Sequence, residues 1–177
     1  MKMLAEAGIP TIGADDIAHD CIRRGKTAYR AILSSFGLNI LKRDRQIDRK
    51  KLGRLVFGDP HQRRRLENIV HPCVAKGLRQ FIQRQQGVIA LDIPLLFEAG
   101  YENWVDSIIV VSCTPAQQLR RLVRRNRLSG QAARRRLASQ MPLADKCRLA
   151  NLVLDNSRSP ASLRRQVEKL IMDLKRA

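Results

Sequence analysis

The chain has 177 residues, of which 34 are Lys or Arg and 16 are Asp or Glu, giving a net charge of +18. Hydrophobic residues make up 44% of it, enough for one domain with a sizeable core. No apolar run approaches the roughly 18 residues of a membrane span, and nothing indicates a signal peptide. The positive charge attracts polyanions of every kind, whereas an aromatic content of 4% argues against a surface that stacks single-stranded nucleic acid.

The four cysteines, Cys21, Cys73, Cys113 and Cys147, are scattered along the chain and form no Cys-x-x-Cys pair. No His/Cys cluster has the spacing of metal ligands either. We therefore expect a reduced, cytoplasmic protein in which the cysteines are buried small hydrophobic side chains and in which the protein itself holds no metal.

Helix signals organise the first half of the chain. Gly8 should end a first helix, because glycine commonly follows the last helical residue. Asp59-Pro60 marks a helix start, an N-cap followed by proline at the first helical position. His71-Pro72 should break that helix near residue 70. The expected elements are helices at 1–7, 16–23, 27–36 and 59–70, a further helix reaching 86, strands at 9–12 and 88–93, and a turn-rich stretch up to residue 49.

The second half repeats this alternation. We expect strands at 107–112 and 152–154, and helices at 114–126, 129–139, 142–149 and 159–175. Four short strands separated by helices predict an α/β fold with a parallel sheet covered by helices, and we expect residues 1–177 to form a single domain. Ligands bind at the carboxyl ends of such strands, so the segment from Asp92 to Glu98 should lie at a site.

Six motifs follow one another along the chain: G-I-P-T-I-G-A-D-D-I-A-H at 8–19, D-P at 59–60, I-V-H-P at 69–72, D-I-P-L-L-F-E at 92–98, Q-M-P at 140–142 and L-D-N at 154–156. Each is weak alone, but in this order and spacing they resemble dephospho-CoA kinase over essentially the whole chain. The resemblance implies a P-loop kinase fold with helical CoA-side and lid regions. It also implies phosphorylation of the ribose 3′-hydroxyl of dephospho-CoA with ATP and Mg²⁺, the last step of coenzyme A synthesis.

The family's opening strand and phosphate loop, G-x-x-x-x-G-K-[ST], do not occur in this sequence. Residues 1–8 align with the later turns of the helix that follows that loop, so we expect about 15 to 20 residues, including the central strand, to be missing. Gly25-Lys26-Thr27 has the ending of such a loop, but Asp20 stands where the first glycine is required and would repel phosphate. We expect the chain as written to be inactive, whether it is part of a longer kinase or a truncated relic.

The resemblance assigns catalysis to Asp15, as the carboxylate that orients the acceptor hydroxyl and takes its proton. The family commonly has another acid two residues earlier, where this chain has Gly13. From the residues alone, Asp15-Asp16 is more typical of a helix N-cap with an acid in the first turn.

The resemblance also implies two sets of binding residues. For dephospho-CoA they are Ala18, His19, His71, Pro72, Pro94, Leu95, Leu96, Phe97 and Glu98. For ATP they are Arg121, Arg125, Gln140 and Asn156, with a lid at about 128–146 that closes guanidinium groups over the phosphates. His71 fits equally well as a satisfied, partly buried histidine, and Leu96 and Phe97 as plain core. Asn126 stands where the family often has Asp.

Two other classes of protein stay open. A nucleoside monophosphate kinase would share the architecture but should lack the combination of Asp15, His71-Pro72 and 94–98. A non-enzymatic nucleic-acid-binding protein would explain the charge, and its binding would weaken steeply with salt. We expect the kinase, with dephospho-CoA and ATP as ligands and neither a membrane nor a specific nucleic acid as partner. The sequence gives no indication of oligomeric state.

Overall fold

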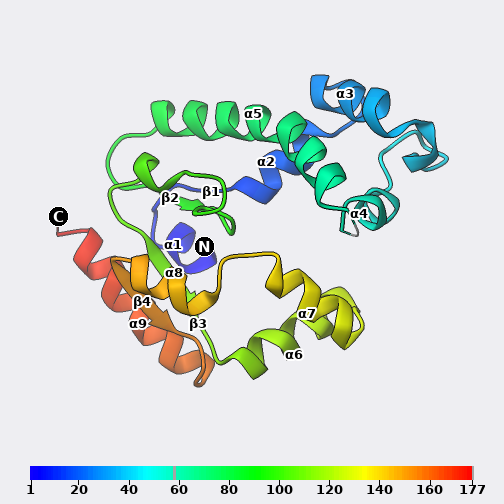
Figure 1. Ribbon diagram of the computed structural model, residues 1–177. Coiled ribbons are helices and arrows are strands. Elements are labelled where there is room, and N and C mark those ends of the chain that lie inside the picture. The colour runs from blue at the N-terminus through cyan, green and yellow to red at the C-terminus, as the bar shows by residue number, and fades with distance from the viewer. Residues whose placement is uncertain (58, 177) are drawn as a thin grey trace. The chain divides into compact units, whose positions relative to one another are not determined.

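The computed structural model describes residues 1–57 and 59–176, which form helices and short parallel strands (Figure 1). This confirms the predicted α/β class. The chain falls into two compact units, Met1–Ile93 and Pro94–Ala177, and each contains one two-stranded parallel sheet. The single domain expected from the sequence stays a prediction.

The first unit builds a parallel strand pair and a helical cluster. Its elements are α1 (Lys2–Glu6), β1 (Thr11–Gly13), α2 (Ala14–Cys21), α3 (Thr27–Phe36), the 3₁₀ turn η1 (Leu38–Ile40), α4 (Arg49–Phe57), α5 (Pro60–Arg84) and β2 (Ala90–Asp92). β1 and β2 pair in parallel, with Gly13 opposite Asp92 at their carboxyl ends. Gly8 follows α1 with a φ of +84°, as the helix-ending glycine predicted from the sequence should.

Helix α5 organises this unit, because α2, α3 and α4 all pack against it (Figure 1). The main cluster of buried side chains comes from α3, α4 and the segment between them: Tyr29, Ile32, Ile40, Ile47, Leu52 and Val56. Leu66, Ile69 and Val70 of α5 pack on this cluster. The turn-rich stretch expected up to residue 49 is followed by a helix that the sequence analysis did not predict, α4, which contributes Leu52 and Val56 to the cluster.

The predicted break at His71-Pro72 is wrong, because α5 runs without interruption from Pro60 to Arg84 with Pro72 inside it. A proline there removes one backbone hydrogen bond and costs about 3 kcal/mol or more. Burial on both sides of the proline outweighs that cost: Ile69 and Val70 pack on the core before it, and Val74 and Leu78 are buried after it.

The contact between α2 and α5 is close, and it overturns the expectation of four unpaired, buried cysteines. A Cβ atom on Gly77 would lie 2.6 Å from Cγ2 of Ile17, so only glycine allows this approach. One turn after Ile17 on α2 and one turn before Gly77 on α5, Cys21 and Cys73 form a disulfide across a Cα–Cα distance of 6.2 Å. Cys113 and Cys147 are free but only half-buried. Because Cys21 and Cys73 are 52 positions apart, sequence spacing could not reveal the pair.

The second unit confirms most of its predicted elements. These are β3 (Ile109–Ser112), α6 (Pro115–Asn126), α7 (Gly130–Ala138), α8 (Leu143–Leu149), β4 (Leu152–Asp155) and α9 (Pro160–Leu174), and a short 3₁₀ turn that was not predicted, η2 (Glu102–Trp104), precedes them. β3 and β4 pair in parallel. The side chains of Thr114, Ser129 and Ser159 cap α6, α7 and α9, because each accepts a hydrogen bond from a backbone N–H of the first turn.

Gly77→Ala should destabilise the protein by about 1 to 3 kcal/mol, because the added methyl group forces α5 away from Ile17. The loss should occur although alanine favours a helix by about 1 kcal/mol over glycine. Chemical denaturation measures the free energy of unfolding. Gly130→Ala is the control, since the nearest atom to its added Cβ lies 3.8 Å away.

Adding Ile17→Ala to Gly77→Ala should recover part of the loss, with a coupling energy above about 0.5 kcal/mol. Purely additive effects of the two substitutions would contradict the close α2–α5 contact.

Candidate functional site

Acidic side chains gather at the carboxyl ends of β1 and β2. Asp92 ends β2 directly beside Gly13, and Asp15 and Asp16 lie in the first turn of α2, which follows β1 without a loop. An open pocket of about 230 Å³ is lined there by Met1, Thr11, Ile12, Gly13, Asp16 and Asp92. The candidate catalytic Asp15 therefore lies at the strand edge where parallel sheets bind ligands.

The acids influence one another. Burial raises the pKa of Asp92, the positive amino terminus lowers it, and the carboxylates of Asp15 and Asp16 raise it further, with a net upward shift. A group whose pKa is raised in this way holds a proton more readily than a free aspartate. Asp92 is thus a second titratable group at the edge that carries Asp15.

Gly13 stands where the resembling family commonly has an acid, and the Asp16 side chain lies against it. Gly13, not Asp15, is the N-cap of α2, and it provides no side-chain cap. A Cβ at Gly13 would meet Oδ2 of Asp16 at 2.9 Å, so the Asp16 carboxylate occupies the space beside the bare backbone. Asp15 and Asp16 are both first-turn acids, where the helix dipole favours negative charge. An acid at position 13 would have to displace Asp16.

Of the predicted acceptor residues in the first unit, two lie on the helix that bears Asp15. Ala18 is half-buried and His19 is exposed, and His19 stands one turn after Asp15 on the same face of α2. His71 and Pro72 are exposed on α5. The role of His71 in binding dephospho-CoA stays a prediction.

The predicted acceptor loop lies in the second unit. Residues 94–100 form a compact turn, in which Ala99 N donates to Leu95 O at 2.9 Å and Tyr101 N donates to Leu96 O at 3.0 Å. Leu96 and Phe97 are half-buried, whereas Pro94 and Leu95 are exposed. The structure gives these residues a defined backbone, and their contact with dephospho-CoA remains a prediction.

Glu98 joins this turn to the end of the predicted lid. Its carboxylate lies 2.8 Å from Lys146 Nζ and accepts from Met141 N at 2.9 Å, and Lys146 also donates to Pro94 O at 3.1 Å. Burial, the largest single influence, raises the pKa of Glu98, but the hydrogen bonds from Lys146 and Met141 together outweigh it, and the net pKa is lowered. Glu98 is thus held as an anion by residues that follow Gln140.

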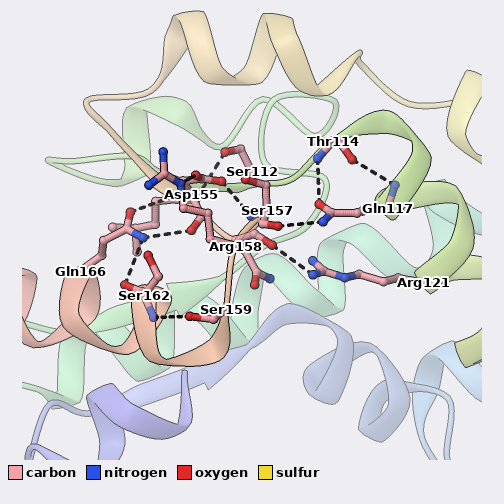
Figure 2. A network of polar contacts seen from close by, with 12 residues as sticks. Ser112, Thr114, Gln117, Arg121, Asp155, Ser157, Arg158, Ser159, Ser162 and Gln166 are labelled. Carbon is pink, nitrogen blue, oxygen red and sulfur yellow. Dashed lines mark hydrogen bonds and ion pairs between the residues drawn. The ribbon is translucent and has the colours of Figure 1, made fainter.

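On the donor side, Figure 2 shows a hydrogen-bond network between α6 and the loop after β4. Gln117 Nε2 donates to Ser157 O at 2.8 Å, and Arg121 Nη2 donates to Asn156 O at 3.0 Å. Asp155 Oδ1 accepts from Ser157 N at 2.7 Å, and Gln166 of α9 bonds both backbone groups of Asp155. The network fixes the loop that contains Asn156 and brings Arg121 to it.

The other predicted donor residues are less constrained. Arg125 is exposed near the end of α6 and donates to its neighbour Asn126 at 3.1 Å. Gln140 lies in the turn between α7 and α8, where its backbone N–H donates to Leu137 O. Within the part of the chain that the structure describes, no three His, Cys, Asp or Glu side chains form a group that could hold a metal ion.

The sequence alone did not reveal Asp92 as a partner of Asp15 and Asp16, nor Lys146 as the partner of Glu98. The sequence does contain a signal for Asp92, because this residue ends an apolar run that is typical of a buried strand. No sequence signal marks Lys146, one of 34 basic residues, because its partner lies 48 positions away.

Parallel strands covered by helices, with acids at the carboxyl ends of β1 and β2, place the chain among the α/β proteins that bind ligands at the carboxyl ends of their strands. The comparisons with known proteins identify the group within that class. The profile of the family described as CoaE, dephospho-CoA kinase, matches residues 1–161. The chain belongs to the dephospho-CoA kinase family.

Individual relatives agree with this assignment. The dephospho-CoA kinase of Geobacillus kaustophilus is 40% identical over 93% of this chain and 84% of its own length. The dephospho-CoA kinase of Thermosynechococcus vestitus is 45% identical over 92% of this chain and 80% of its own length. Among solved structures, dephospho-CoA kinase from Campylobacter jejuni matches with a TM-score of 0.70 at 34% identity. TT1252 from Thermus thermophilus matches with a TM-score of 0.78 at 29% identity. Each match covers 98% of this chain and 88% of the other chain.

The comparisons favour the kinase over the two other classes that the sequence left open. No helix among the described residues combines the length and the apolar character that a membrane span requires.

Glu98→Gln should lower the free energy of unfolding by about 1 to 2 kcal/mol at neutral pH, because it removes a charge-assisted hydrogen bond from Lys146, whose side chain is only 12% exposed. The folded state lowers the pKa of Glu98, so its contribution is present above the ordinary value of 4.5 and is lost as the pH falls below it. The difference between parent and variant should therefore shrink in acid, as denaturation at several pH values will show.

Asp145→Asn is the matched control for this pair. Asp145 pairs with Arg148 at 3.0 Å on the surface, with side chains 41% and 78% exposed, and its loss should cost less than about 0.5 kcal/mol. Equal effects of the two substitutions would contradict a structural role of the Glu98 pair.

Proposed function

We propose that Asp15 is the catalytic carboxylate of a kinase that phosphorylates the ribose 3′-hydroxyl of dephospho-CoA. The observation that carries this proposal is its position, in the first turn of α2 directly after β1, at an edge shared with Asp92. An exposed carboxylate there can accept a hydrogen bond from the acceptor hydroxyl and take its proton as the phosphoryl group arrives. Membership of the dephospho-CoA kinase family supports the choice of acceptor.

On the donor side, we assign ATP to Arg121, Arg125, Gln140 and Asn156. Arg121 already holds the loop at Asn156, which suits that loop to receive the nucleotide base, and the exposed guanidinium of Arg125 is free to turn toward phosphate oxygens. Two arginines on one helix would neutralise the charge that builds up on the phosphoryl group in the transition state.

We propose that magnesium enters with ATP as the substrate MgATP, because protein sites for Mg²⁺ commonly supply one or two carboxylates and leave the remaining ligands to phosphates and water.

We propose a cytoplasmic location, because the proposed reaction consumes ATP. The Cys21–Cys73 disulfide argues against a permanently reduced compartment. Counting free thiols in the protein from its source cells will show whether Cys21 and Cys73 are bonded or reduced there. Reduced cysteines would agree with a cytoplasmic location.

The polypeptide of residues 1–177 alone should have near-background kinase activity. Its sequence contains no G-x-x-x-x-G-K-[ST] loop, and positioning and charge stabilisation of the phosphates are almost the whole of phosphoryl-transfer catalysis. The measurement is chromatography of coenzyme A formed from dephospho-CoA and ATP. Robust turnover by this polypeptide would contradict the prediction.

In a chimera that adds the opening strand and phosphate loop of a relative, Asp15→Asn should lower turnover by about 10² or more while ATP binding barely changes. Arg125→Ala should instead impair ATP use together with turnover. If the Asp15→Asn chimera keeps turnover within a few-fold of its parent and a normal circular dichroism spectrum, Asp15 is not the catalytic carboxylate.

A further inference from the structure

A second open pocket in the first unit, of about 290 Å³, has a positively charged lining. Its wall consists of His19, Ile22, Arg23, Lys42, Gln46, Ile47 and Arg49. Only His19 of this group was predicted as a binding residue, because no motif in the sequence singles out Arg49 or Lys42. A pocket with three permanent cations suits a ligand with clustered negative charge.

The cations differ in how far they are already neutralised. Arg23 lies 3.3 Å from the Asp20 carboxylate, so its charge is partly satisfied. For Arg49 and Lys42, no carboxylate of the described residues lies within ion-pair distance, although Lys42 acts at longer range to lower the pKa of Asp48. Arg49 Nη1 donates to His19 Nε2, and because arginine can only donate, this nitrogen of His19 is the acceptor. Arg49 and Lys42 therefore have charge to offer to a ligand.

The loop that presents Lys42 and Gln46 is firmly built. Tyr29 Oη donates to Arg45 O at 2.6 Å, and Lys42 N donates to Gln46 O at 2.9 Å. Asp48 holds the start of α4, since its carboxylate accepts from Lys50 N at 2.9 Å, and this places Arg49 at the first helical position. Ile47 is buried in the core at the same point. The pocket is thus supported by the folded helical cluster.

The pocket is connected to the candidate catalytic residue through α2. His19 follows Asp15 by four residues, so the two side chains project from the same face about 6 Å apart along the helix axis. In dephospho-CoA the 5′-oxygen that carries the diphosphate is only a few bonds from the 3′-hydroxyl. A ribose with its 3′-hydroxyl at Asp15 can therefore direct its 5′-diphosphate toward His19 and the cations behind it.

We propose that Arg49 and Lys42, together with His19 and Arg23, form the subsite for the 5′-diphosphate of dephospho-CoA. This inference rests on the proposed function, because it takes the 3′-hydroxyl to lie at Asp15. Arg49 and Lys42 contribute binding and orientation of the acceptor and no proton transfer. They select an acceptor that carries a 5′-diphosphate over a bare nucleoside.

The test compares equilibrium binding of dephospho-CoA and of adenosine to residues 1–177 by NMR titration. Arg49→Gln should weaken the binding of dephospho-CoA about ten- to a hundredfold, which is the effect of losing a charge-assisted hydrogen bond. The affinity for adenosine should stay within about twofold of the parent. Lys42→Gln should also weaken the binding of dephospho-CoA. Arg54→Gln is the matched control, because Arg54 is an exposed arginine of the same helix outside the pocket. Thermal unfolding checks that each variant is folded.

The outcomes separate the inference from the function on which it rests. If the parent binds dephospho-CoA no better than adenosine, the proposed function fails and the subsite with it. If the parent prefers dephospho-CoA but Arg49→Gln and Lys42→Gln match Arg54→Gln, only the subsite is refuted. A third titration with inorganic pyrophosphate tests for a general anion site: variants that lose pyrophosphate but keep dephospho-CoA would also overturn the subsite.

Discussion

The close packing of α2 on α5 is the constraint on which the acceptor side of this protein depends. Gly77 leaves room for Ile17, and the Cys21–Cys73 disulfide lies one helical turn away from this contact on both helices. Since Asp15 and His19 lie on this same short helix, the contact fixes both side chains relative to the helical cluster. A helix of eight residues is too short to be stable alone, so tertiary packing must hold it in place.

Much of the secondary structure could be predicted, because it rests on local chemistry. Asp59, Thr114, Ser129 and Ser159 each cap a helix that starts where expected, since a side-chain oxygen can satisfy the free amides of a first turn in any context. At Pro72, local chemistry predicts a helix break that does not occur, because buried side chains on both sides of the proline keep α5 continuous. The Cys21–Cys73 bond and the Arg49–His19 contact could not be predicted, since both depend on how distant segments pack.

The structure shows what several of the many positively charged residues contact. On composition alone, +18 was compatible with any polyanion. Some of these cations have structural tasks, as Lys146 does in holding Glu98, and Arg121 in holding the loop at Asn156. Others, above all Arg49, line a pocket one helical turn from Asp15. The family assignment and the position of these cations together favour a nucleotide over nucleic acid as the anion that the chain binds.

We infer that α2 orients dephospho-CoA, with its 3′-hydroxyl at Asp15. A crystal structure of this chain with dephospho-CoA bound tests this placement. We predict the ribose 3′-oxygen within hydrogen-bond distance of an Asp15 carboxylate oxygen, and the diphosphate within hydrogen-bond distance of the Arg49 guanidinium. A ligand whose ribose lies away from Asp15, or whose diphosphate points away from α2, would contradict this placement.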